Sequence, residues 1–191
     1  MRSSRPWLRC GKLYCDLRSR LEAGKEPQPI HPGAVMAFDE FLKVLAQFAD
    51  KDLDYILIGG VALNIHGIAR ATEDIDLFID PQPDNIEKLR QALKALYDDA
   101  SIDEITAEAL SGEYPTLRYI PPEGALYFDI LTRLGTCASY DDLKAEEIEV
   151  EGIKITVATP RTLYWLKRDT LRTIDQADAE ALMKKFNLDE K

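Results

Sequence analysis

The chain has 191 residues, of which 46% are hydrophobic, and carries a formal net charge of −10 at pH 7. This length supports one ordinary hydrophobic core, so one main domain is the default expectation. No stretch approaches the run of about 18 apolar residues that spans a bilayer, and no signal-peptide core is present. We therefore expect a cytoplasmic protein with no membrane contact.

The first 35 residues differ in charge from the rest of the chain. They carry seven basic and three acidic side chains, a net of +4, whereas residues 36–191 carry 17 basic and 31 acidic ones, a net of −14. This break and three prolines between positions 27 and 32 predict a boundary. An organelle transit peptide or a basic nucleic-acid arm are alternatives. We favour residues 1–35 as a poorly ordered extension, Met36 as the natural start, and residues 36–191 as the domain.

Cysteine and histidine provide little chemistry in this chain. Cys10, Cys15 and Cys137 give neither a disulfide framework nor a Cys-x-x-Cys zinc pattern, which fits a reducing cytoplasm. Histidine occurs only at His31 and His66, which argues against a histidine-based zinc site. A Cys137 and His66 nucleophile pair has no local signature to support it.

The first predicted elements are a helix, a strand and a glycine turn. Residues 38–51 carry apolar side chains at helical spacing and precede a buried-type strand over 54–58. The strand runs into Gly59-Gly60 and then Val61 to His66, which has helical character. Glycine lets a backbone approach an anion closely, and the start of a helix favours negative charge. The segment therefore predicts a phosphate-binding turn.

The next segment alternates between apolar and acidic residues. In Asp74 to Asp80, Ile75, Leu77 and Ile79 fall on one strand face, whereas Asp74, Asp76 and Asp80 fall on the other. Neighbouring carboxylates repel, which raises at least one pKa unless a cation lies between them. Magnesium binds such oxygen ligands together with substrate phosphates. An exposed edge strand is the alternative, although aspartate is a poor strand former.

The remaining elements interleave strands with helices. A helix is expected from Pro83 to about Leu96, and a loop with a short helix over 98–112. Strands over 116–120 and 125–132 flank the turn Pro121-Pro122-Glu123-Gly124, and a hairpin joins 147–150 to 153–157. Helices over 160–171 and 175–186 close the chain, the first with Thr159-Pro160 at its start. These elements predict an α+β domain with one mixed β-sheet flanked by helices.

The strand over 125–132 adds a third carboxylate. Asp129 alternates with apolar neighbours, and three carboxylates on neighbouring strands suit two ions, one at the attacking oxygen and one at nucleotide phosphates. Asp74, Asp76 and Asp129 are thus the predicted metal ligands and catalytic residues. We predict Mg²⁺ as the cofactor, with Mn²⁺ as a substitute.

These motifs carry a family resemblance over about residues 37–185. Ile58-Gly-Gly-Val-Ala-Leu and Arg70-Ala-Thr-Glu-Asp-Ile-Asp-Leu-Phe resemble the signature of the nucleotidyltransferase superfamily of polymerase-beta-like fold, and most closely its AbiEii-type abortive-infection branch. The tail is similar as well, with Thr159-Pro160, Lys167, Arg172 and two later aspartates, Asp175 and Asp178. Gly60 stands where many relatives have a serine.

The resemblance implies a magnesium-dependent enzyme that moves a nucleoside monophosphate from a nucleoside triphosphate to a hydroxyl. It implies a toxin-like role, with RNA as acceptor, a transfer-RNA end in particular, and a cognate antitoxin protein as partner. It gives Lys167 as the first triphosphate contact and Arg172 as the second. The nucleotide-binding set that we expect is Gly59, Gly60, Arg70, Thr72, Lys167 and Arg172.

Two other functions stay open at this point. One is a non-catalytic nucleotide-binding or interaction module of the same fold, and the other is an antitoxin-like adenylyltransferase that modifies a protein. Lys167 and Arg172 also suit a solvated helix face, and Asp175 and Asp178 suit a helix start. Tyr127, Tyr164 and Trp165 suit either base stacking or the core.

Overall fold

The computed structural model describes residues 38–188, except 73, 113–114, 124–125 and 135–137. The expectations for residues 1–35, for Met36 and for the three cysteines concern positions outside these ranges.

The helices follow the predicted order along the chain. The α-helices are α2 (Phe38–Asp50), α3 (Gly59–Ile65), α4 (Pro83–Lys94), α5 (Ala107–Ser111), α6 (Pro160–Lys167) and α7 (Thr173–Phe186), and two 3-10 turns are η1 (Ala100–Glu104) and η2 (Tyr140–Asp142). α6 begins as predicted: Pro160 occupies the first turn, and the Thr159 hydroxyl accepts a hydrogen bond from the Thr162 backbone N–H.

The strands form one mixed sheet, which confirms the predicted α+β fold class. They are β1 (Tyr55–Ile58), β2 (Asp74–Ile79), β3 (Thr116–Tyr119), β4 (Tyr127–Leu131), β7 (Ala145–Val150) and β8 (Ile153–Ala158), in the order β3-β4-β2-β1-β8-β7. β1 is parallel to β8 and β2 to β4, while the other neighbours are antiparallel. A small ribbon of β5 (Arg133–Leu134) and β6 (Ala138–Ser139), which the sequence did not predict, lies beside it.

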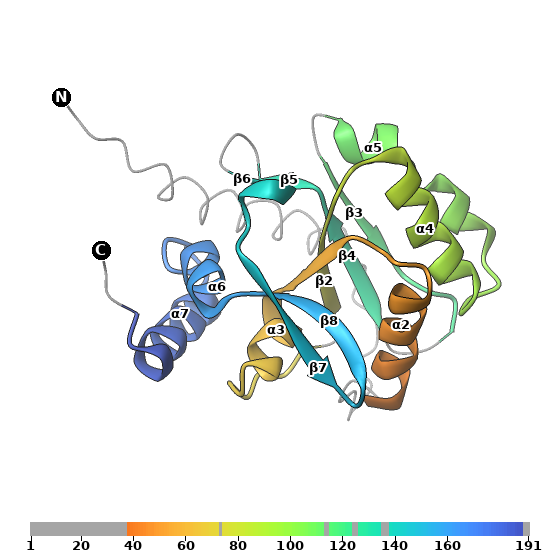
Figure 1. Cartoon of the computed structure of the whole chain (residues 1–191). Coiled ribbons are helices and arrows are strands. Elements are labelled where there is room, and N and C mark those ends of the chain that lie inside the picture. Colours follow the sequence, from red (N-terminus) through yellow and green to blue (C-terminus); the bar gives the residue numbers. More distant parts are fainter. Residues whose placement is uncertain (1–37, 73, 113–114, 124–125, 135–137, 189–191) are drawn as a thin grey trace.

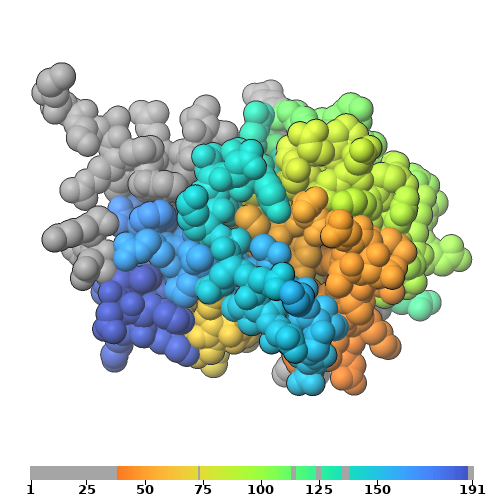
Figure 2. All heavy atoms as spheres, viewed as in Figure 1, coloured from red at the N-terminus to blue at the C-terminus, as the bar shows by residue number. Residues whose placement is uncertain are grey.

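The two faces of the sheet have different partners. Phe48 of α2 contacts Tyr55 of β1, and Tyr97, just beyond α4, contacts Phe128 of β4. Tyr55 and Phe128 share a face with Leu77, because each pairs with a β2 residue an even number of positions from it. That face is therefore covered by α2 and α4, which form one continuous surface in Figure 2. The aspartates of β2 occupy the opposite face.

The C-terminal helices lie away from α2 and α4. Figure 1 shows α6 and α7 packed together at the far end of the molecule, with α3 below the centre of the sheet. α3 contacts β1, β2 and α6, so it lies between the sheet and the C-terminal pair. This arrangement brings the segment that follows α3 close to α7.

The predicted boundary at the glycine pair was wrong. We expected a glycine turn followed by a helix from Val61, but α3 begins at Gly59, and both glycines form its first turn. The helix is also short, with 7 residues. Gly59 has a φ of 69°, in the left-handed region, so the strand passes into the helix without a separate loop.

In the part of the chain that the structure describes, no helix is both long enough and apolar enough to span a membrane.

A buried asparagine ties α4 to the two central strands and gives the first prediction. The Asn85 side chain is 3% exposed, accepts from the Asp54 N–H at 2.8 Å, and donates to the Asp54 and Asp80 carbonyls at 2.8 and 2.9 Å. Asn85→Ala should lower the free energy of unfolding by roughly 1–3 kcal/mol, because partly buried backbone groups of Asp54 and Asp80 lose their partner.

Urea unfolding measures this loss, and Gln91→Ala on the exposed side of the same helix is the matched control. We expect the control to stay within about 0.5 kcal/mol of the parent. Equal losses for the two variants would show that Asn85 does not hold the strands.

Candidate active site

Three buried aspartates form a row on the face opposite α2 and α4, here called the carboxylate row: Asp74, Asp76 and Asp129. Asp74 and Asp76 are two residues apart on β2, and Asp129 of β4 lies directly opposite Asp76 in a parallel pair. Their exposed fractions are 7%, 1% and 0%. Alternation along each strand puts all three on the same face, as the sequence predicted.

Gly59 makes room for the centre of this row. A Cβ atom at position 59 would lie 1.7 Å from Oδ2 of Asp76 and 2.5 Å from its Cγ, closer than any side chain can approach. Ile58, the residue before it, is paired with Asp76 across β1 and β2. Two features therefore require glycine at position 59: its positive φ, and the carboxylate of Asp76 packed against its α-carbon.

Gly60 and Thr72 form the second contact beside the row. A Cβ at position 60 would lie 2.8 Å from Cβ and 2.9 Å from Oγ1 of Thr72. The Thr72 hydroxyl donates to Oδ1 of Asp74 at 2.6 Å. The threonine thus fills the space beside Gly60 and supports the first carboxylate of the row.

Asp129 has a cationic partner of its own. Arg118 of β3 faces Asp129 in the antiparallel pair of β3 and β4. Its Nε and Nη2 donate to Oδ1 and Oδ2 of Asp129, each at 2.6 Å. The two side chains are 9% and 1% exposed. Both oxygens of this carboxylate are therefore bonded to one guanidinium group in the two-pronged geometry typical of arginine and carboxylate.

The C-terminal helices contribute a second group of charges, here called the ion network: Arg70, Lys167, Arg172, Asp175 and Asp178. Nζ of Lys167 lies 2.7 Å from Oδ1 of Asp175 and 2.8 Å from Oδ2 of Asp178, and all three side chains are buried. Lysine on α6 therefore joins two carboxylates on α7.

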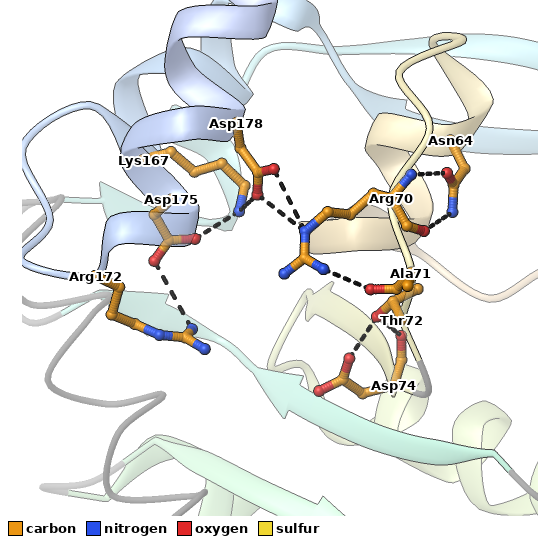
Figure 3. Close-up of polar contacts among 9 residues, drawn as sticks. All are labelled: Asn64, Arg70, Ala71, Thr72, Asp74, Lys167, Arg172, Asp175 and Asp178. Carbon is orange, nitrogen blue, oxygen red and sulfur yellow. Dashed lines mark hydrogen bonds and ion pairs between the residues drawn. The ribbon is translucent and has the colours of Figure 1, made fainter. Parts of the chain in front are cut away.

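Two arginines extend the ion network. Nε of Arg70 lies 3.3 Å from Oδ1 of Asp178, and Nη1 of Arg172 lies 3.7 Å from Oδ2 of Asp175. Each arginine side chain is 24% exposed, compared with 5% for Lys167. In Figure 3 the Arg70 guanidinium lies between Lys167 and Asp74, whereas the Arg172 guanidinium lies beyond Asp175, to the left of Asp74. Of the two arginines, Arg70 is thus the one on the side of the row.

The backbone around Arg70 is held by α3. Asn64 accepts from the Arg70 N–H at 2.7 Å and donates to the Arg70 carbonyl at 2.8 Å (Figure 3). Nη1 of Arg70 donates to the Ala71 carbonyl at 2.5 Å. These contacts fix the segment between α3 and β2, so that the arginine and Thr72 approach the row from one side.

The donor set fits a magnesium ion in part. Asp74 and Asp76 are adjacent carboxylates of the kind that binds Mg²⁺ together with substrate phosphates. Asp129 is beside them but bonded through both oxygens to Arg118. Among the residues described by the structure, no group of three or more histidine, cysteine, aspartate or glutamate side chains is arranged to hold a metal ion. Metal binding by Asp74, Asp76 and Asp129 stays a prediction.

A family model described as the nucleotidyl transferase AbiEii toxin of type IV toxin–antitoxin systems matches residues 40–182. The chain belongs to the AbiEii family. It is accordingly a nucleotidyltransferase of a toxin–antitoxin family, as the sequence motifs predicted.

A solved structure is also similar to this AbiEii-family chain. It is a crystal structure from Thermotoga maritima of a protein named as a candidate nucleotidyltransferase, with 14% identity and a TM-score of 0.46, covering 78% of this chain and 94% of that chain. None of the curated proteins compared with the chain matches it. The assignment rests on the family match.

The structure brings most of the predicted site residues into two neighbouring groups. Gly59, Gly60 and Thr72 surround the carboxylate row, whereas Arg70, Lys167 and Arg172 belong to the ion network. Lys167, predicted as the first triphosphate contact, is buried between two carboxylates. Its contact with nucleotide stays a prediction.

The three aromatic residues considered for base stacking differ in burial. Tyr164 is buried on α6, and Cζ of Arg168 lies over the Tyr164 ring, 5.6 Å from the centroid of that ring. Trp165 is half-buried with the guanidinium of Arg161 over its ring. Tyr127 lies at the start of β4, paired with Asp74. A role in base stacking stays a prediction for each of them.

Arg118 is the site residue that sequence reasoning missed. The signal was present, because the predicted strands over 116–120 and 125–132 flank a turn at Pro121 to Gly124. A hairpin centred on that turn would pair Arg118 with Tyr127, two residues before Asp129 and on the same face; the structure instead pairs Arg118 with Asp129. The turn therefore indicated the face of Arg118, and the exact register decided its partner.

The close approach of Gly59 to Asp76 predicts a large effect of one methyl group. Gly59→Ala should destabilise the fold by about 1–2 kcal/mol through its left-handed backbone and by a further 1–3 kcal/mol, roughly, through overpacking against the buried carboxylate. Gly152→Ala is the control, since Gly152 also has a positive φ, of 80°, but a Cβ added there would meet nothing within 4 Å.

Chemical denaturation gives the free energy of unfolding of both variants. The difference between their losses measures the effect of the contact with Asp76. If the two glycines gave the same loss, the clash with the carboxylate would contribute nothing.

The buried position of Lys167 predicts a structural effect as well. Lys167→Met leaves Asp175 and Asp178 buried without their shared cation, so the free energy of unfolding should fall by about 3–5 kcal/mol. Lys184→Met, at an exposed position of α7, removes the same charge and should change stability by less than about 0.5 kcal/mol. Thermal and urea unfolding compare the two. A stable Lys167→Met protein would leave nucleotide binding as the main role of this lysine.

Proposed function

We propose that this AbiEii-family protein is a magnesium-dependent nucleotidyltransferase that moves a nucleoside monophosphate from a nucleoside triphosphate onto a hydroxyl of RNA. The observation that carries the proposal is the placement of two buried, adjacent carboxylates, Asp74 and Asp76, on the strand that follows Arg70, whose partly exposed guanidinium lies on the Asp74 side of the ion network in Figure 3. Negative and positive groups are thus separated across one site, which suits a metal-bound polyphosphate.

In this proposal Asp74 and Asp76 hold Mg²⁺. When bound, the ion supplies charge neutralisation for the phosphates and a Lewis acid for the transfer. Thr72 orients Asp74 through its 2.6 Å hydrogen bond. Gly59 lets Asp76 lie against the first turn of α3. These residues keep the two carboxylates in place before the substrate arrives.

The arginines are proposed to bind the phosphates. Arg70 and Arg172 each keep about a quarter of the side chain exposed, at 24%, and each is held by an aspartate of α7 on its inner side. A guanidinium group can bind two phosphate oxygens at once. Lys167 binds Asp175 and Asp178 behind the arginines, so its positive charge supports the site from within.

The choice of acceptor rests on the family. Membership of a toxin family favours a nucleic acid or protein of the host cell as the target, and RNA is our choice. A labelled transfer assay decides among the alternatives. The protein is incubated with each labelled nucleoside triphosphate, Mg²⁺ or Mn²⁺, and total RNA or cell extract.

Label on RNA supports the proposal, and label on protein supports the adenylyltransferase alternative. A folded sample that neither transfers label nor binds nucleotide with metal would leave a non-catalytic module. Removal of divalent ions with a chelator should abolish transfer, and added Mg²⁺ should restore it.

The assigned carboxylates can be tested directly. A paired Asp74→Asn and Asp76→Asn variant should reduce transfer by at least about 10³-fold, because the site loses both negative oxygen ligands. The control is Asp84→Asn with Asp141→Asn, two exposed acids elsewhere that give the same change in net charge. We expect the control to keep the parent rate, and full activity in the first variant would refute the assigned site.

A further inference from the structure

Two uncharged side chains, here called the platform, extend the carboxylate face of the sheet beyond Asp74: Ile120 and Tyr127. Tyr127 of β4 is paired with Asp74 of β2. In the pair of β3 and β4, Arg118 lies opposite Asp129. The same register, continued by two residues, sets Ile120 opposite Tyr127. Because residues two apart on a strand share a face, the platform lies beside the carboxylate row and on the same face.

The accessible surface of this face increases toward the platform. In the other direction the face is closed, because Phe78 and Leu131, the next pair on this face, are buried. Asp74 is the most exposed of the three aspartates, Tyr127 is half-buried, and Ile120 is 48% exposed. A lone exposed isoleucine is ordinary on a protein surface, but Ile120 lies at the open end of the candidate active site.

The proposed phosphate contacts lie on the other side of Asp74. Gly59 and Gly60 belong to α3, which contacts β1 and β2, and Arg70 lies in the segment between α3 and β2. The sheet order puts β4 and β3 on the opposite side of β2 from β1. A nucleotide whose polyphosphate lies at α3 therefore leaves the platform to the group that approaches from the far side.

The transfer reaction requires an approach from that side. The acceptor oxygen forms a bond to the α-phosphorus as the bond from that phosphorus to the pyrophosphate oxygen breaks. Pyrophosphate leaves, and the proton of the hydroxyl passes to solvent. The attacking and leaving oxygens lie roughly in line, so pyrophosphate at α3 places the acceptor hydroxyl toward β4. The nucleoside that carries this hydroxyl then lies over Ile120 and Tyr127.

We infer that Ile120 and Tyr127 bind the terminal base of the acceptor RNA, and not the base of the incoming nucleoside triphosphate. The inference rests on the proposed function and specifies its acceptor side. Both side chains are uncharged and one is aromatic, which suits the flat face of a base better than a phosphate. Stacking tolerates every base, so the platform requires a base at the RNA end but discriminates weakly between bases.

RNA binding to the full-length protein tests the platform without relying on catalysis. The probe is an oligonucleotide with the terminal sequence of the RNA that the transfer assay labels. Ile120→Ala should raise its dissociation constant at least about fivefold, the lower range for a lost stacking contact. The dissociation constant for nucleoside triphosphate with Mn²⁺ should stay within about twofold of the parent. Phe38→Ala is the control and should change neither constant, since Phe38 is 53% exposed on α2, on the opposite side of the sheet.

A second oligonucleotide, whose last nucleotide keeps its hydroxyls but lacks its base, separates a direct contact from an indirect effect. Removing the base should weaken binding to the parent at least about threefold more than binding to Ile120→Ala, because the variant has already lost part of the contact. A purely structural role would weaken both RNAs equally. An equal effect of base removal on the two proteins would therefore overturn the inference.

Tyr127 is tested by keeping or removing its ring. Tyr127→Phe should bind RNA within about twofold of the parent, whereas Tyr127→Ala should resemble Ile120→Ala. Equal weakening by the two substitutions would contradict stacking on the ring. If Tyr127→Ala does not fold, Tyr127→Phe and the exposed Ile120→Ala still decide.

The remaining outcomes assign a failure to its source. Weaker triphosphate binding by Ile120→Ala, with unchanged RNA binding, would place the base of the incoming nucleotide on the platform and overturn the inference. If the parent transfers no label to RNA, the proposed function fails and the inference fails with it. If the parent labels RNA but Ile120→Ala binds RNA as the parent does, the platform alone is refuted.

Discussion

The burial of negative charge on one sheet face constrains the structure around it. Asp74, Asp76 and Asp129 have almost no exposed surface, and a buried carboxylate without partners is far less stable than one in water. The neighbours of the three aspartates differ. Arg118 neutralises Asp129, the Thr72 hydroxyl donates a hydrogen bond to Asp74, and the absence of a side chain at Gly59 leaves room for Asp76. The identities of these neighbours follow from the row.

The ion network also contains buried carboxylates, and here each of them is paired with cations. Asp175 and Asp178 are buried on α7, and Lys167 bonds to both of them from α6. Arg70 reaches the same cluster from the segment after α3. A buried ion pair contributes little net stability compared with apolar packing, but it fixes geometry, because a misplaced charge has no alternative partner. The network therefore sets where the C-terminal helices lie relative to the carboxylate row.

The sequence predicted features that depend on local pattern. Alternation over Asp74 to Asp80 indicated both the strand and the face of its carboxylates, and Thr159-Pro160 indicated the start of α6. Features that depend on pairing between distant segments were harder. The sequence around Lys167 also suited a solvated helix face, and nothing local indicates that two aspartates of α7 will surround its amine. In the structure this lysine is buried between them. The boundary at Gly59 was missed because the positive φ of one residue lets the helix start at once.

The net charge of the chain, −10, is opposed to a polyanionic substrate. Salt screening reduces this repulsion, because exposed charges more than about 8–10 Å from a bound phosphate contribute little at physiological ionic strength. What a phosphate group meets at the site is the local arrangement: the ion network has three cations and two anions, and its arginines are the accessible part. Under the proposed function, the carboxylate row would repel a bare phosphate but attract one that carries a divalent cation. In that case the charges that make the protein acidic would favour a nucleotide that arrives with its metal over a nucleotide without it.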